Sequence, residues 1–360
     1  MRATIKDVSA RAGVSTKTVS RVLNREKYVS DEVRQRVEAA IEALSFQPSA
    51  AARMLAGKRS HQIALIYDNH SPHYIHQIQT GIWERCIEEG VRLLAQPSDA
   101  ASPNLAAEIG GLIDQTQVDG VILSSPVTDA VAALEELDRR GVPYVRISPG
   151  TDHGRSPSVS MDDVQAADDM TSHLIALGHT RIGFIIGHVN HTASDLRLYG
   201  YRRALDRAGL PYEPRYVRQG QFDFASGEAA ADAMLDLPIP PTAIFASNDD
   251  MAAGVLTVAH RRGIPLPGGL SVAGFDDTAL ASQLWPPLTT VRQPTRQLAH
   301  AAASLLFEGV EGPVNRRLAH ELVLRGSTAP PGGAARSALD HEGGRADAQA
   351  QRQRRGDNDR

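Results

Sequence analysis

Apolar residues recur three and four positions apart in the first 44 residues, a spacing typical of amphipathic helices. The first segment begins with Thr4 and Asp7, a capping-box-like pair, and carries Val8 and Ala12 on one face. Gly13 follows, and glycine readily takes the positive φ that ends a helix. These residues predict a short helix that stops at Gly13.

Two more helices follow in the same pattern. Ser15 is placed to cap a helix from residue 16 to about residue 24, whose inward positions are Val19, Val22 and Leu23. Ser30 starts a third helix that runs to about Leu44, with a core stripe of Val33, Val37, Ala40, Ile41 and Leu44. Two short helices joined by an Ala-Gly-Val turn are the helix-turn-helix pattern.

Beyond residue 61 the pattern changes to short buried strands that alternate with amphipathic helices. A first set of strands fits IALIY, VRLLA, GVILSS and YVRIS, and a second set fits RIGFIIG, RYVRQG, TAIFAS and LSVAGF. This βαβ rhythm predicts an α/β fold with parallel sheets. Because the rhythm restarts after Ser160, we expect two doubly wound lobes with a ligand cleft between their strand ends.

The segment between these parts, residues 47–60, is a candidate hinge. Gln47-Pro48 ends the third helix, and SAAARMLAGKRS then offers a cap at Ser49, a run of helix formers and a stop at Gly57. A helix of about eight residues is marginal on its own, so the segment would fold only against a partner. Its basic residues Arg53, Lys58 and Arg59 favour DNA as that partner; a plain linker is the alternative.

Charge separates the two parts of the chain. Residues 1–60 hold twelve Lys and Arg against six Asp and Glu, whereas the remainder holds 26 against 36. A basic module on an acidic body indicates that only the N-terminal part meets a polyanion.

The single cysteine, Cys86, excludes an intrachain disulfide and a cysteine metal cluster, and no apolar run approaches the ~18 residues of a membrane span. The first residues contain no apolar segment of the signal-peptide kind, so we expect a cytoplasmic protein.

The second helix carries the candidate DNA contacts. The first part of this helix enters the major groove in helix-turn-helix proteins, and here it presents Thr16, Lys17 and Arg21 outward as candidate base readers. Short polar side chains beside them suit phosphate oxygens: Ser15, Thr18, Ser20 and Asn24. The alternative is a generic helical bundle with a solvated polar face.

Polar and aromatic residues near the strand ends are candidates for the ligand cleft. Carboxylate, amide and guanidinium groups can make paired hydrogen bonds to neighbouring hydroxyls, and an aromatic ring can stack on the apolar face of a sugar. The candidates that follow strands or their loops are Asp68, His73, Tyr74, Arg197, Phe222, Asn248 and Asp276. A helix cap or an interdomain salt bridge is the alternative role for each polar residue.

Several other positions favour capping or packing. We expect Asp249 and Asp277 to be helix caps rather than ligand contacts. His173 and His179 have no partner at metal-ligand spacing, so we expect core or surface roles and no metal site. Trp285 in WPPL fits either the cleft wall or simple packing.

The chain closely resembles the lac repressor/gal repressor (LacI/GalR) family. The DNA-binding headpiece and hinge of that family match TIKDVSARAGVSTKTVSRVLN and YVSDEVRQRVEAAIEALSFQPSAAARMLAGK. The resemblance continues through HLIALGHTRIGFIIG, PTAIFASNDDMAAGVL, LSVAGFDD and WPPLTTVRQP, and covers about residues 3–327. It implies a periplasmic-binding-protein fold in which the chain crosses between lobes three times, with effector contacts at Arg197, Phe222, Asn248 and Asp276.

The resemblance also implies a role for the hinge. In the family, the hinges of two subunits fold together in the minor groove of the operator. The position of Leu55 then wedges between bases and kinks the duplex, while the small Ser49 and Ala52 allow close approach.

These interpretations divide the chain into a headpiece (1–46), a hinge and linker (47–60), a two-lobed core (61–329) and a tail (330–360). Within the core, lobe 1 takes residues 61–161 and 295–322, and lobe 2 takes 162–294 and 323–329. The tail has one leucine, no aromatic residue and no heptad. We therefore expect a disordered tail and a dimer rather than a tetramer.

We expect a homodimeric DNA-binding regulator, a repressor of carbohydrate-utilisation genes, without a cofactor. Its partners would be near-palindromic double-stranded operator DNA and a small sugar-like effector that controls operator affinity. Two rivals remain: an enzyme or a secreted sugar-binding protein with the same two-lobed fold. No G-x-S-x-G elbow, phosphate-binding loop or zinc motif occurs, and neither rival explains the basic headpiece.

Overall fold

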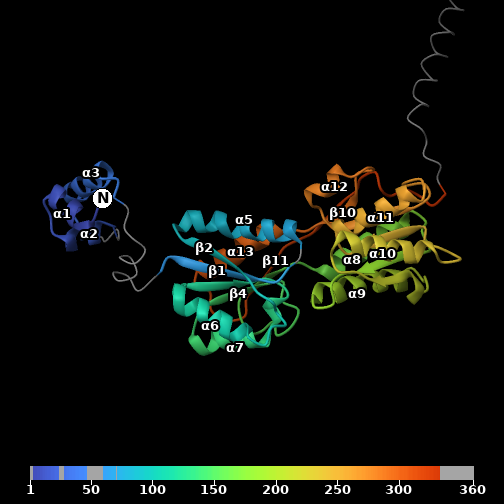
Figure 1. The fold of residues 1–360 in the computed structure, drawn as a ribbon, viewed down its shortest axis with the longest axis horizontal. Coiled ribbons are helices and arrows are strands. Elements are labelled where there is room, and N and C mark those ends of the chain that lie inside the picture. The colour runs from blue at the N-terminus through green and yellow to red at the C-terminus, as the bar shows by residue number, and fades with distance from the viewer. Residues whose placement is uncertain (1–2, 24–27, 47–59, 70, 333–360) are drawn as a thin grey trace, which may run out of the picture.

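The computed structural model describes residues 3–23, 28–46, 60–69 and 71–332. A small helical domain is followed by two α/β lobes that lie end to end (Figure 1). The predictions for Asn24, Ser49, Ala52 and Leu55, and for the tail from residue 333, fall outside the described residues.

The described part of the N-terminal domain consists of α1 (Ile5–Ala12), α2 (Thr16–Leu23) and α3 (Asp31–Ala43). The backbone N–H and the hydroxyl of Thr4 both donate to Oδ2 of Asp7, each at 2.7 Å, and Gly13 ends α1 with φ 63°. A small apolar core joins the helices: Val8, Ala12, Val19, Val22, Val37, Ala40 and Phe46. The predicted helix start at Thr4 and the stop at Gly13 are confirmed.

Lobe 1 is built on a parallel sheet with the strand order β11-β5-β4-β3-β1-β2. The strands are β1 (Gln62–Tyr67), β2 (Arg92–Pro97), β3 (Gly120–Leu123), β4 (Tyr144–Ile147), β5 (Ser158–Ser160) and β11 (Asn315–Arg317). One face packs against α5 (Pro72–Glu89) and α13 (Thr295–Phe307). The other face packs against α6 (Leu105–Thr116) and α7 (Val131–Arg140), beside the short η1 (Val127–Asp129). Both faces are therefore covered, which explains why the central strands β1 and β3 are buried and almost continuously apolar.

Lobe 2 repeats the plan with the strand order β12-β10-β9-β8-β6-β7. The strands are β6 (Ile182–Ile186), β7 (Val217–Gln219), β8 (Ala243–Ala246), β9 (Ser271–Asp276), β10 (Thr289–Arg292) and the antiparallel edge strand β12 (Glu321–Val323). One face packs against α8 (Asp163–Ala176) and α9 (Thr192–Arg207), and the other against α10 (Phe224–Leu235) and α11 (Asp249–Arg261). The short helices η2 (Pro214–Tyr216) and α12 (Ala279–Gln283) complete the lobe. Among the described residues, no helix is both long and apolar enough to cross a bilayer.

The chain passes between the lobes at three places: after β5, after β10 and after β11. We expected lobe 1 to extend to residue 322, but Glu321 already pairs with Arg292 of β10 in the second sheet. The third boundary between the lobes therefore lies before Glu321, two residues earlier than expected, because strand pairing in lobe 2 begins at this residue. Two contacts accompany the crossings: Arg317 with Asp162 at 3.3 Å and His320 with Asp169 at 2.9 Å.

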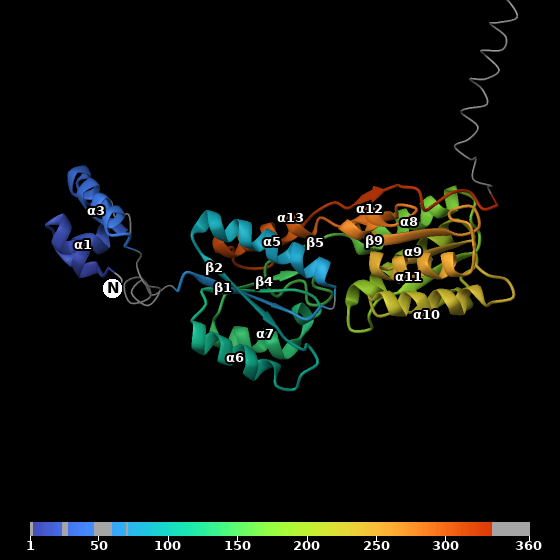
Figure 2. The same cartoon turned by 45° about the horizontal axis from the view of Figure 1, so that its top comes forward.

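The parallel strands bring the site together. In each sheet the carboxyl ends of the parallel strands lie at one edge, and these two edges face each other across the junction of the lobes (Figures 1 and 2). Loops from distant parts of the chain therefore meet at the junction.

Arg146 of β4 shapes the lobe 1 side of this junction. Its side chain is 0% exposed, and its guanidinium donates to three backbone oxygens at 2.7–2.8 Å and to Oδ1 of Asp129 at 2.8 Å. The Asp129 carboxylate also accepts from the backbone N–H of Gly150 at 2.9 Å and from the hydroxyl of Thr192, in lobe 2, at 3.4 Å. A buried charge requires such complete pairing, so Arg146 and Asp129 hold the loop after β4 against the other lobe.

Candidate ligand pocket and nucleic-acid interface

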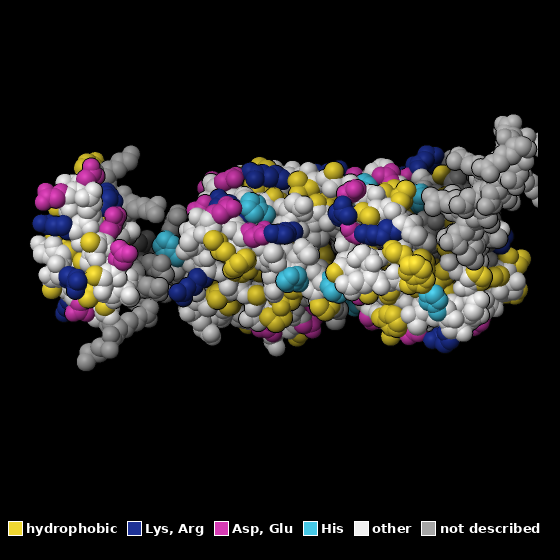
Figure 3. Space-filling model, turned by 90° about the horizontal axis from the view of Figure 1, so that it is seen from above, with side chains coloured by type: hydrophobic (Ala, Val, Ile, Leu, Met, Phe, Trp, Pro, Cys, Tyr) yellow, Lys and Arg dark blue, Asp and Glu magenta, His cyan; other side chains and the backbone are white. Residues whose placement is uncertain are grey.

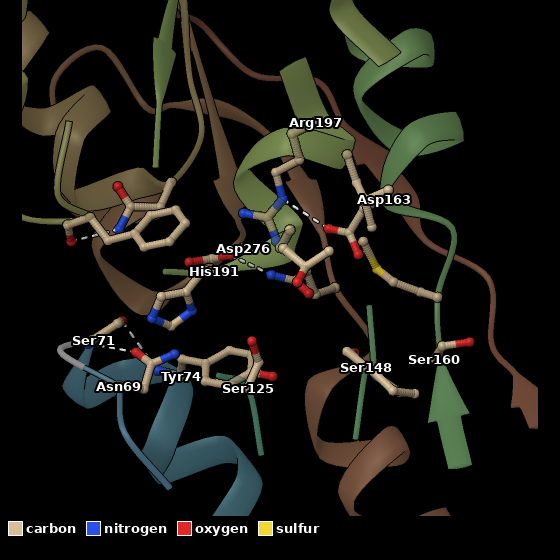
Figure 4. A pocket seen from close by; sticks show the side chains of 18 residues that line it. Asn69, Ser71, Tyr74, Ser125, Ser148, Ser160, Asp163, His191, Arg197 and Asp276 are labelled. Atoms are coloured by element: carbon tan, nitrogen blue, oxygen red, sulfur yellow. Dashed lines mark hydrogen bonds and ion pairs between the residues drawn. The ribbon is translucent and has the colours of Figure 1, made fainter. Parts of the chain in front are cut away.

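A pocket lies between the lobes where the strand ends meet (Figure 4). It contains about 710 Å³ of space outside the protein atoms, part of it open to solvent. Lobe 1 contributes Asn69, Ser71, Tyr74, Ser125, Ser148, Pro149, Ser160 and Met161. Lobe 2 contributes Asp163, His191, Thr192, Ala193, Leu196, Arg197, Phe222, Asn248, Asp276 and Gln293.

The lobe 1 wall of the pocket is rich in neutral hydroxyl groups. Ser125 follows β3, Ser148 follows β4 and Ser160 ends β5, so three neighbouring strands each contribute one serine. Burial raises the pKa of Tyr74 to about 12, so its hydroxyl stays protonated at neutral pH. This wall can donate to and accept from a polar ligand without adding charge.

The lobe 2 wall carries the charged groups, and Arg197 is central to it. Its Nε donates to Oδ1 of Asp163 at 2.8 Å, and its Nη1 donates to the backbone oxygen of Ser247 at 2.6 Å. The guanidinium carbon lies 3.6 Å from the ring centroid of Phe275, and this cation–π contact further stabilises the position of the guanidinium group. Arg197 is thus fixed before any ligand binds, and its charge is already balanced by Asp163.

Asp276, the last residue of β9, places a second carboxyl group in the pocket. Gln293 donates to its Oδ1 at 2.5 Å. Burial raises the pKa of Asp276 to about 7, and the positive charge of Arg197 opposes that rise. The protonated form of this carboxyl group is therefore favoured more than in an exposed aspartate, and that form can donate as well as accept a hydrogen bond.

Phe222 supplies the aromatic surface that was predicted for this wall. It takes a left-handed backbone conformation with φ 62°, and its backbone oxygen accepts from Nδ2 of Asn248 at 2.9 Å. Oδ1 of the same Asn248 accepts from the Met251 N–H at 2.9 Å and so caps α11. The ring of His191 stands nearly perpendicular to Phe222, with centroids 5.4 Å apart.

Five of the seven predicted cleft residues line this pocket: Tyr74, Arg197, Phe222, Asn248 and Asp276. Asp68 and His73 do not line it. The Asp68 carboxylate instead accepts from the backbone N–H of Ala100 at 2.9 Å, and His73 is exposed on the first turn of α5. Both follow β1, but neither side chain is among the residues that line the pocket.

The expectation that Asp249 and Asp277 are caps was wrong, although neither lines the pocket. Asp249 is buried in the first turn of α11 and accepts from the Thr278 backbone N–H at 2.7 Å and the Thr290 hydroxyl at 2.6 Å. Asp277 pairs with Arg292 at 2.7 Å and, on its other side, with an arginine beyond β12. Each carboxylate ties segments of lobe 2 together instead of ending a helix.

Among the pocket residues that were not predicted from the sequence are Asp163, His191 and Gln293. Each stands at or near a lobe crossing or a helix start, where strand periodicity carries no signal. Two other uncertainties are resolved: Trp285 is 80% exposed and lies outside the pocket, and His179 is buried with hydrogen bonds to Thr242 and Ala329. Among the described residues, no group of three or more His, Cys, Asp or Glu side chains could hold a metal.

The headpiece presents the predicted DNA contacts on α2. Thr16, Lys17 and Arg21 are exposed, and Lys17 and Arg21 lie four residues apart on one face of the helix. Ser15 caps this helix, because its Oγ accepts from the Thr18 backbone N–H at 3.1 Å. Thr18 and Ser20 are half-buried.

Known protein families match both the N-terminal helical domain and the two-lobed core of the chain. The family model of bacterial regulatory proteins, lacI family, matches residues 4–49, and that of a periplasmic binding protein-like domain matches residues 171–328. The HTH-type transcriptional regulator DegA of Bacillus subtilis (strain 168) is 36% identical over 336 residues, which cover 92% of this chain and 99% of DegA. The chain belongs to the LacI family of bacterial regulatory proteins.

Other LacI-family proteins are similarly related. The ribose operon repressor of Escherichia coli (strain K12) is 35% identical and covers 86% of this chain and 94% of its own length. The structure of the lac repressor dimer bound to operator and the anti-inducer ONPF matches with a TM-score of 0.79 and 30% identity, covering 91% of this chain and 100% of that one. The predicted family and fold class are confirmed. This LacI-family member is a DNA-binding transcriptional regulator and not an enzyme.

The buried carboxyl of Asp276 predicts a pH-dependent effect of Asp276→Asn on stability. The folded-state pKa of about 7 lies above the ordinary value of 3.8, so burial costs the wild type stability as the pH rises from about 4 to about 7. Asparagine carries no charge, so the ligand-free variant should be more stable at pH 8, by at most about 4 kcal/mol for a shift of about three units. The difference should shrink towards zero near pH 4.

Calorimetric unfolding at pH 8 and pH 5 would measure this effect. Glu135→Gln, at an exposed position of α7, is the matched control and should change the melting temperature little at either pH. A melting-temperature gain for Asp276→Asn that is as large at pH 5 as at pH 8 would contradict the raised pKa.

Proposed function

We propose that this chain is a homodimeric repressor that binds near-palindromic operator DNA through α2, with its operator affinity controlled by a neutral sugar in the interlobe pocket. The observation that carries the proposal is the composition of the two walls. A fixed Arg197, the buried carboxyl group of Asp276 and the ring of Phe222 face a row of serine hydroxyls across the pocket. Binding to genomic DNA implies a cytoplasmic location.

The charged side chains of the pocket favour an uncharged ligand. The positive charge of Arg197 is balanced by Asp163, and Asp276 adds a further carboxyl group. A phosphate or carboxylate in this space would meet net negative charge, whereas hydroxyl groups can donate to Asp276 and accept from the guanidinium. Named relatives point the same way: one is a ribose operon repressor, and a similar structure at 31% identity is a CelR–cellobiose complex.

A thermal-shift screen of D-ribose, cellobiose, D-glucose and ribose 5-phosphate would test the ligand class. A sugar at 100 times its Kd should stabilise the protein by about 2.7 kcal/mol. We expect a neutral sugar to raise the melting temperature and the phosphate to have no effect. A shift with ribose 5-phosphate alone would contradict the neutral class.

Asp276→Ala should weaken the binding of that sugar about 100-fold, because it removes a hydrogen-bonding partner inside a desolvated site. Arg197→Ala should do the same but would also leave Asp163 buried without its partner, so Asp276→Ala is the cleaner variant. Glu135→Gln, exposed on α7 and outside the pocket, is the control and should bind normally in calorimetry. Normal sugar affinity in Asp276→Ala would place the effector elsewhere.

Base reading is assigned to the exposed face of α2. Arg21→Ala should cost about 1–3 kcal/mol for the cognate operator and relax discrimination at one base pair, because arginine can make two hydrogen bonds to guanine. Fluorescence anisotropy on operator and on random DNA would measure it. Arg36→Ala, exposed on α3, is the control. An equal loss on both DNAs would reduce Arg21 to a phosphate contact.

Dimerisation is assigned to the side of the lobes that carries α5 and α12. Both views place these helices on the same side of the molecule (Figures 1 and 2), and hydrophobic side chains are visible on both lobes from that side (Figure 3). Trp83 and Ile87, one turn apart on α5, are 55% and 57% exposed, and Trp285 after α12 is 80% exposed. These include both tryptophans of the chain, and large exposed apolar residues mark interaction surfaces. A two-fold pairing of this side also places two headpieces for two half-sites about one helical turn apart.

Trp83→Arg should therefore convert a dimer into a monomer in sedimentation velocity and weaken operator binding. Val131→Arg is the control, since Val131 is 60% exposed on α7, on the opposite face of the lobe 1 sheet. A Trp83→Arg protein that remains dimeric would exclude this side as the interface.

A further inference from the structure

The point where the chain enters lobe 1 is held by one carboxylate. Ser60 is the first described residue after the segment 47–59. Oδ1 of Asp119 accepts from the Ser60 backbone N–H at 2.7 Å and from its hydroxyl at 3.2 Å, while Oδ2 accepts from the His61 N–H at 2.8 Å. Three donors from two consecutive residues thus converge on a single side chain.

This arrangement is more than the capping of a strand. His61 takes φ 53°, a left-handed conformation that costs a non-glycine residue free energy, and the bond to Asp119 compensates for it. The clamp is also reciprocal, because the backbone N–H of Asp119 donates to the oxygen of Gln62 at 2.7 Å. Ser60 is 3% exposed, so the chain is fixed two residues before β1 begins.

The position of Asp119 in the sheet links the clamp to the pocket. Asp119 directly precedes β3, and Ser125 at the other end of this strand lines the pocket. Ser60 and His61 directly precede β1, which pairs with β3 in parallel, and Asn69 beyond its far end also lines the pocket. Two adjacent buried strands therefore run from the clamp to the effector site. Figures 1 and 2 show the start of β1 at the end of lobe 1 that faces the helical domain.

We propose that Asp119 is a positioning residue for operator binding: it fixes the geometry with which the DNA-binding domain is attached to the effector lobe. The inference rests on the proposed function, because only an operator-binding dimer needs this attachment to be rigid. A held attachment point moves with the sheet when the lobes move, whereas a free one would let the headpieces take many relative positions. Two headpieces must reach two half-sites at once, so a loss of this geometry weakens specific binding.

Asp119→Asn tests the proposal, because the amide keeps the size of the side chain but directs an N–H₂ group at a backbone donor. Asp114→Asn is the matched control: Asp114 is an exposed carboxylate on the same side of lobe 1, paired with Arg140 at 2.6 Å. Hydrogen exchange at the amides of Ser60 and His61 should become about tenfold faster in Asp119→Asn and stay unchanged in Asp114→Asn. Ser60→Ala removes only the hydroxyl bond and should give a smaller effect.

Operator affinity of the full-length protein is the second readout. Asp119→Asn should weaken operator binding about tenfold, within the range typical of coupling between sites. Affinity for random DNA should stay at its wild-type value, since the headpiece is untouched, while the melting temperature of the core should fall only slightly with the lost hydrogen bonds. Asp114→Asn should bind like the wild type.

Two results would overturn the proposal. Wild-type operator affinity in Asp119→Asn, despite faster exchange at Ser60 and His61, would show that the clamp does not position the headpieces. A lowered melting temperature with parallel losses on operator and random DNA would assign Asp119 a purely structural role. Failure of the wild type itself to bind any operator would instead reject the proposed function, which makes the two failures distinguishable.

Discussion

Parallel strands present their carboxyl ends at one edge of a sheet, and in this protein two such edges face each other. Every strand in the two sheets except β12 runs in parallel with its neighbours. The loops that leave these edges come from segments up to about two hundred residues apart, yet they line one pocket. The three crossings between the lobes keep the edges opposed, so the pocket, its walls and its access all depend on this constraint.

Charge is concentrated on one wall of the pocket, at a cost in stability. Asp163 and Arg197 neutralise each other at 2.8 Å, whereas burial raises the pKa of both Asp249 and Asp276. Isolated carboxyl groups of this kind destabilise a fold unless a ligand or hydrogen bonds satisfy them. Asp249 finds its partners in two threonines, but Asp276 keeps an oxygen directed at the pocket. A ligand group that donates a hydrogen bond to this oxygen would offset part of that cost.

The same sheet that carries the serine wall also receives the chain from the DNA-binding domain. Pocket residues stand at the carboxyl ends of β1 and β3, and the contacts of Asp119 stand at their amino ends. Strands buried on both faces are stiff elements, so both ends move together. Under the proposed function, a rotation of lobe 1 against lobe 2 would change the place from which the headpiece emerges, so that a ligand would act on DNA without touching it.

Local patterns decide the elements of this fold. The capping pair at Thr4 and Asp7, the stop at Gly13 and the apolar strand runs are signals within a few residues, and the structure confirms each. The candidate pocket residues that directly follow a strand, such as Asp276, were also accessible, because a parallel sheet sends its strand ends to one edge. Residues in the hinge, among them Leu55, remain predictions, since they lie outside the described part of the chain.

Contacts between distant segments were decided only by tertiary packing. Asp163 meets Arg197 across 34 positions of sequence, and Asp119 meets Ser60 across 59. Asp249 looked like a cap because it starts a helix, but Asn248 takes that role and leaves Asp249 to bind Thr278 and Thr290. Which of two adjacent polar residues turns inward depends on the neighbours that other loops supply. Those neighbours are set by how the sheets pack and where the chain crosses, and no periodicity along the chain records them.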